Sequence, residues 1–136
     1  MASYLMIASA GIILALGTVH LLLTFFGSML RPRDATVEAA MKASYPGLTT
    51  QTTMWKAWIG FNASHSLGAI AFGLIYGYLA IYESSVLFGS SFLSALGLPM
   101  LVAFALLGKF YWFADPLRGI LAALACYAAA IGLVWL

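Results

Sequence analysis

The chain has 136 residues, of which 64% are hydrophobic and only 7% are charged, and its formal net charge is +2. A soluble domain is about 45–50% apolar, so this composition excludes a soluble protein and predicts a single membrane domain over residues 1–136. The lipid bilayer is therefore the expected partner, and nucleic acid is excluded. The single cysteine, Cys126, cannot form an internal disulfide.

Four apolar stretches are long enough to cross a bilayer, which takes about 20 residues. They cover approximately residues 4–29, 57–82, 91–111 and 117–136. Backbone polar groups in lipid must be satisfied within their own segment, so each stretch is expected to be a helix. The first stretch lacks a positively charged start and is interpreted as a retained helix, not a signal peptide. The sequence thus predicts an all-α, polytopic membrane protein, built as a bundle of four transmembrane helices.

The first connection is long enough to contain a helix of its own, over approximately residues 34–44. Asp34 is a suitable N-cap, and Glu38 and Lys42 have the i, i+4 spacing of an ion pair. We expect this helix to lie along the cytoplasmic membrane surface. Thr49 or Thr50 is expected to cap an extension of the second membrane helix.

The remaining connections are short. Residues 83–90 are expected to form a polar loop between the second and third spans. Pro99 should kink the third helix or lie near its start. Pro116 suits the first turn of the fourth helix.

The cations predict the orientation of the chain in the membrane. All six Lys and Arg residues lie in two connections, 30–56 and 109–118. The positive-inside rule therefore places these two loops in the cytoplasm and both termini on the outer side.

Two histidines at membrane depth are the strongest functional signal. His20 and Thr24 share one face of the first span, and Trp58, Asn62 and His65 form a stripe on the second. Ionisable groups inside a membrane are rare and usually face the protein interior with a partner. At 1.5 Å rise per residue, both imidazoles lie roughly 13–17 Å from the inner charged edge. We therefore expect one shared polar site between the first two helices.

Several functions would use such a site. It could hold a small apolar ligand such as a quinone or a lipid in a binding or accessory protein. It could instead be a b-type haem site with His20 and His65 as axial ligands, or it could relay protons. The plainest interpretation is a hydrogen bond that keeps two helices in register. Two histidines alone make a weak zinc site. The sequence has no catalytic motif and no acidic residue within a span, so neither an enzyme nor a cation-coupled exporter is expected.

Small residues recur at helical spacing and predict close helix packing. More such stripes are present than four helices need among themselves, which favours a homo-oligomer or a larger membrane complex. The stripes are Gly60, Ser64 and Gly68; Ala69, Gly73 and Gly77; and Ala122, Ala125, Ala129 and Gly132.

Four segments carry a resemblance to a known family: GTVH at residues 17–20, MWKAWIGFNASHSLG at 54–68, YWF at 111–113 and PLRG at 116–119. Together they resemble a family of small, uncharacterised four-helix membrane proteins of bacteria. The resemblance implies a location in the bacterial inner (plasma) membrane. It marks the stripe of Trp58, Asn62 and His65, together with Arg118, for testing, and it implies no activity and no cofactor.

Overall fold

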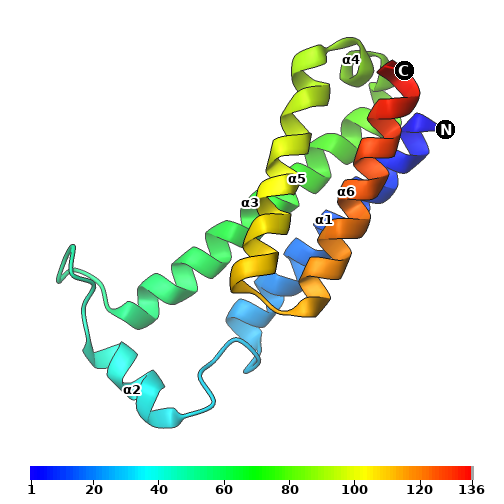
Figure 1. Cartoon of the computed structure of the whole chain (residues 1–136). Helices are drawn as coiled ribbons and strands as arrows, with labels where there is room; N and C mark the ends of the chain where they lie inside the picture. The colour runs from blue at the N-terminus through cyan, green and yellow to red at the C-terminus, as the bar shows by residue number, and fades with distance from the viewer. Residues whose placement is uncertain (136) are drawn as a thin grey trace. The chain divides into compact units, whose positions relative to one another are not determined.

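The computed structural model describes residues 1–135, and over that range the chain is helical without a strand. The all-α prediction is confirmed. Four helices, α1, α3, α5 and α6, are long and apolar enough to cross a membrane, which indicates a multi-pass membrane protein. The helices are α1 (Ala2–Phe26), α2 (Ala35–Ala43), α3 (Met54–Tyr82), α4 (Ser84–Gly89), α5 (Ser91–Tyr111) and α6 (Ala114–Trp135) (Figure 1).

The ends of the long helices differ from the predicted ends by a few residues. α5 has the predicted bounds, whereas α1 ends at Phe26 and α3 begins at Met54, three residues earlier than predicted. The expected caps of α3 were wrong. Thr53 Oγ1 accepts a hydrogen bond from the backbone N–H of Lys56 at 3.3 Å, whereas Thr49 Oγ1 accepts from the N–H of Gln51 in the preceding turn, at 3.1 Å.

The polar loop expected at residues 83–90 was also wrong, because this segment contains the short helix α4. Its Leu87 is fully buried, and the hydroxyl of Ser94 in α5 donates to the Leu87 carbonyl at 2.8 Å. Ser90 caps α5 by accepting from the N–H of Leu93. The apolar Val-Leu-Phe run within the segment explains why it folds against the protein.

The chain divides into two compact units, which we describe separately. Unit 1 comprises Met1–Leu16 and Ala69–Leu136, and unit 2 comprises Gly17–Gly68. The long helices α1 and α3 each contribute residues to both units. Unit 1 contains both termini, which lie at the same end of it (Figure 1). Unit 2 contains α2 and the connections on either side of it.

In unit 1, α1 and α3 approach closely at Gly73. A Cβ atom at this position would lie 2.6 Å from Leu14 Cβ and 2.8 Å from the carbonyl oxygen of Ala10. Real Cβ atoms do not approach so closely, so only glycine fits here. The stripe of Ala69 and Gly73 therefore packs as predicted. The buried apolar core of the unit consists of Met6, Ala10, Ile13, Ala69, Phe72, Tyr76, Ala80, Leu87, Leu101, Ile120, Ala123, Tyr127 and Ala130.

Two tyrosines organise the packing of α3, α5 and α6 in this unit. Tyr127 is fully buried, and its hydroxyl donates to the carbonyl of Ser94 at 2.9 Å. The hydroxyl of Tyr76 donates to the carbonyl of Leu93, also at 2.9 Å. The two rings are in edge contact, with centroids 5.6 Å apart. Gly97 makes room for Tyr127, because a Cβ there would lie 2.6 Å from the Tyr127 ring carbon Cζ.

The small-residue stripe on α6 does not pack as predicted. The buried face of α6 consists of Ile120, Ala123, Tyr127 and Ala130, whereas Ala122, Ala125 and Ala129 are exposed. The buried face combines the large Tyr127 ring with the small Ala123 and Ala130.

Candidate intramembrane polar site

A hydrogen bond joins the two helices of unit 2 at the predicted position. His20 Nε2 in α1 and Asn62 Oδ1 in α3 are 2.9 Å apart. The amide nitrogen of Asn62 donates to the Trp58 carbonyl one turn earlier, at 2.8 Å, and this bond directs the amide oxygen toward α1. Since an amide oxygen can only accept, His20 donates from Nε2 to Asn62.

The second histidine lies against the first. The ring centroids of His20 and His65 are 5.4 Å apart, and the ring planes are nearly perpendicular, at 85°. Both imidazoles are half-buried. The sequence therefore predicted correctly that these two side chains meet between the first and second membrane helices.

Two other predicted site residues make their hydrogen bonds elsewhere. The Thr24 hydroxyl donates to the carbonyl of His20 in its own helix, at 2.7 Å, so it is occupied by the α1 backbone. The indole N–H of Trp58 donates to the carbonyl of Leu30, at 3.2 Å. Trp58 thus ties the start of α3 to the chain that follows α1. It supports the site through its own carbonyl, which holds Asn62.

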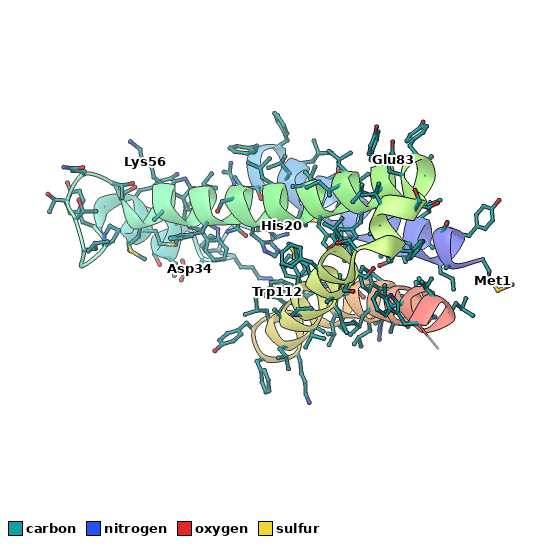
Figure 2. All side chains as sticks on the ribbon, turned by 90° about the horizontal axis from the view of Figure 1, so that it is seen from above. Met1, His20, Asp34, Lys56, Glu83 and Trp112 are labelled. Atoms are coloured by element: carbon teal, nitrogen blue, oxygen red, sulfur yellow. The ribbon has the colours of Figure 1, made fainter. Side chains whose placement is uncertain are left out.

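The site lies well inside the two helices that carry it. His20 is six residues before the end of α1, which corresponds to roughly 9 Å along the axis. His65 is eleven residues after the start of α3 at Met54, which corresponds to roughly 16 Å along the axis. Within unit 2, Figure 2 shows Asp34 and Lys56 at one end, with His20 further along the helices.

The arrangement does not fit a haem between the two histidines. Axial imidazoles bind haem iron through ring nitrogens on opposite sides of the metal. Here the two rings are in direct edge contact, which leaves no gap for a porphyrin. In addition, His20 Nε2 already bonds to Asn62. No group of three or more His, Cys, Asp or Glu residues that could hold a metal ion occurs within residues 1–135.

A second polar cluster lies at the basic end of unit 2. Trp55 is flanked by the guanidinium of Arg31, 5.9 Å from the ring centroid, and by the ammonium of Lys42, at 5.4 Å. Lys42 donates to Glu38, and Arg31 lies 3.9 Å from the same carboxylate. The sequence predicted the Glu38–Lys42 pair. It missed Trp55 because only the fold brings α2 beside the start of α3.

The carboxylates of α2 have lowered pKa values for different reasons. The hydroxyl and the backbone N–H of Thr36 donate to Asp34, at 2.7 and 2.8 Å, and they lower the pKa of the Asp34 carboxyl. These bonds confirm Asp34 as the N-cap. The hydrogen bond from Lys42 lowers the pKa of Glu38, with a smaller effect from the charge of Arg31.

Comparisons with protein-family models, with curated proteins and with solved structures gave no match. The resemblance to a bacterial four-helix family therefore stays an expectation from the sequence segments that carry it.

Proposed function

We propose that this protein is a small binding or accessory protein of the bacterial inner membrane, with an intramembrane site formed by His20, Asn62 and His65. The ligand would be an apolar molecule with a carbonyl or hydroxyl group, such as a quinone or a lipid. The observation that carries the proposal is the His20–Asn62 hydrogen bond with His65 against it, at a depth where polar groups are costly.

The exposure of the cluster supports a binding role. His20, Asn62 and His65 are all half-buried, although a pair that served only to join helices would be most stable fully enclosed. A neutral imidazole offers one donor and one acceptor nitrogen. With Nε2 bonded to Asn62, His20 has its second ring nitrogen, Nδ1, for a hydrogen bond with a ligand hydroxyl group.

The depth of the cluster supports the same ligand class. His20 is about two helical turns from the end of α1 and His65 about three turns from the start of α3, so a polar group near the polar–apolar boundary of the bilayer can reach the cluster. Amphiphilic molecules with a polar ring or headgroup and an apolar tail lie at this boundary. Asn62, held by the Trp58 carbonyl, would fix the orientation of His20 while the imidazoles contact the ligand.

The proposal includes a topology. The four spans form a bundle, α2 lies on the cytoplasmic membrane surface, and loops 30–56 and 109–118 are cytoplasmic, with both termini outside. The distribution of the six cations supports this orientation. The exposed small residues Gly60 and Ser64 of α3, with the exposed alanines of α6, support assembly into a homo-oligomer or a larger membrane complex.

Ligand-dependent thermal unfolding tests the binding role. We would add a short-chain ubiquinone analogue to the full-length protein in detergent and measure the unfolding temperature. A ligand at 100 times its Kd stabilises a protein by about 2.7 kcal/mol, so we expect a clear upward shift. Asn62→Leu and His20→Phe should abolish the shift. Ser64→Ala is the matched control, because Ser64 is exposed on α3 and its hydroxyl donates to the Phe61 carbonyl of its own helix.

The same experiment distinguishes binding from a purely structural pair. If Asn62→Leu lowers the unfolding temperature while neither the quinone nor co-purifying lipid stabilises the wild type, the cluster only joins the helices. Native mass spectrometry of the purified protein would reveal such a lipid. If the quinone does not stabilise the wild type and no lipid co-purifies with it, the proposed function is overturned.

A further inference from the structure

A hollow with two arginines lies in unit 2 where the chain leaves α1 and enters α2. It is far along the chain from His65 and shares no residue with the histidine site. Its lining consists of Ser28, Met29, Arg31, Pro32, Arg33, Ala35 and Glu38.

The charges around the hollow are not balanced. Glu38 is the one carboxylate in the lining, and it already accepts from Lys42 and lies near Arg31. The carboxylate of Asp34, next in sequence to Arg33, is occupied by the two bonds from Thr36. Arg33 forms no ion pair with any residue in the described range 1–135. The hollow therefore has an arginine available for an anion from outside the chain.

The backbone that forms the hollow is held in place by neighbouring groups. The N–H of Arg31 donates to the carbonyl of Ser28 at 3.1 Å, and the indole of Trp58 donates to the carbonyl of Leu30 at 3.2 Å. Pro32 restricts its own φ angle. A site whose backbone is ordered before binding loses less conformational entropy on binding than a mobile loop does.

Apolar side chains are exposed in the same segment of the chain as the arginines. Met29, which lines the hollow, is 80% exposed, and Phe26 at the end of α1 is 85% exposed. The exposed Met29 and the unpaired Arg33 in the same lining match a molecule that has both an anionic head and an apolar tail. A free inorganic anion would use only the arginines and leave these side chains without a partner.

We propose that the hollow between α1 and α2 binds the phosphate headgroup of an anionic phospholipid, with Arg33 as the principal contact and Arg31 beside it. The guanidinium group matches phosphate geometry and donates two parallel hydrogen bonds. Met29 and Phe26 contact the upper part of the acyl chains. Basic pockets at the cytoplasmic side of membrane helices bind anionic headgroups in this way.

Native mass spectrometry of the full-length protein in detergent tests this assignment. We would titrate phosphatidylglycerol and, separately, phosphatidylcholine, and measure the lipid-bound fraction. Wild type should bind phosphatidylglycerol more tightly. Arg33→Gln should weaken that binding about fivefold, since one basic residue near anionic lipid contributes about 1 kcal/mol. Arg33→Lys should retain much of the affinity, and a circular dichroism spectrum should confirm that each variant is folded.

Arg118→Gln is the matched control, because Arg118 is exposed and already paired with Asp115 at 3.4 Å. It should bind phosphatidylglycerol like the wild type. Equal losses in the two glutamine variants would show a general charge effect and overturn the site, as would unchanged binding in Arg33→Gln. Displacement of the lipid by inorganic phosphate at similar concentration would show a phosphate site without a lipid requirement and would overturn the assignment. The histidine variants would leave these results unchanged, so the two proposals fail independently.

Discussion

The side-chain amide of Asn62 in α3 accepts a hydrogen bond from the imidazole of His20 in α1, with 2.9 Å between Oδ1 and Nε2. A double-mutant cycle of His20→Phe and Asn62→Leu should therefore show coupling. Interhelical hydrogen bonds in membranes average about 0.6 kcal/mol and reach about 1.7 kcal/mol. We expect a coupling energy within that range from reversible unfolding in mixed micelles.

The control cycle combines His20→Phe with Ser64→Ala, because the Ser64 hydroxyl bonds within its own helix. The changes in unfolding free energy caused by these two substitutions should add. If the first pair is also additive, the hydrogen bond contributes nothing to the stability of the folded chain.

Gly73 offers a sharp test of helix packing. Gly73→Ala should destabilise the protein by about 1–3 kcal/mol, since its Cβ would lie 2.6 Å from Leu14 Cβ and 2.8 Å from a backbone carbonyl. Gly60→Ala on the same helix is the control, because nothing lies within 4 Å of its added methyl group. It should be neutral or slightly stabilising. Equal unfolding free energies for the two variants would contradict the close approach of α1 and α3 at Gly73.

The hydrogen bond of the buried Tyr127 in α6 can be tested separately. Tyr127→Phe removes the donor to the Ser94 carbonyl and should cost about 1 kcal/mol, while the ring continues to fill the core. Tyr78→Phe is the control, because Tyr78 is 57% exposed. Unfolding of both variants in detergent should show a loss only for Tyr127→Phe, and a loss of the same size in Tyr78→Phe would refute the role of this bond.

Helix α2 should weaken in acid. The pKa of Asp34 lies below its ordinary value of 3.8 because Thr36 donates two hydrogen bonds to the carboxylate. A lowered folded-state pKa means that the cap stabilises α2 above the ordinary value and is lost as the pH falls through the lowered value. The Thr36 amide resonance in NMR spectra should shift in that acidic range. In Asp34→Asn, which caps without titrating, that shift should disappear, and its persistence would show that another group causes it.

The contact between the two histidines predicts the absence of a bis-histidine haem spectrum. Protein produced with haem available should show no Soret band that depends on His20 or His65, because the rings are in edge contact and His20 Nε2 bonds to Asn62. Absorption spectra of the wild type and of His65→Ala test this. A Soret band in the wild type that disappears in the variant would mean that the two helices separate to admit a porphyrin.

Much of the secondary structure could be predicted from local sequence. Long apolar runs must be helical in lipid because no water is available for the backbone, and α5 has the predicted bounds. Asp34 caps α2 because its carboxylate reaches N–H groups only two residues away. The meeting of His20 and His65 could also be anticipated, since two consecutive antiparallel helices bring residues of similar depth together.

Other features of the fold and of the candidate site could be recognised only from the tertiary structure. Thr24 shares a helix face with His20, yet its hydroxyl bonds to the backbone of α1, a choice that residue spacing does not reveal. The exposed alanines of α6 could not be told from a packing stripe, because in a membrane both buried and lipid-facing surfaces are apolar. The helix α4 was missed because its one buried side chain, Leu87, depends on a contact with α5.

By itself, the sequence determined that this chain crosses a membrane as helices and that two imidazoles lie at similar depth, because composition and helical rise act locally along the chain. Only the tertiary structure decided which atoms these imidazoles contact, that Gly73 and Gly97 admit close neighbours, and that Arg33 has no carboxylate partner within residues 1–135. Those properties depend on distances between segments far apart in sequence, and no local pattern encodes such distances.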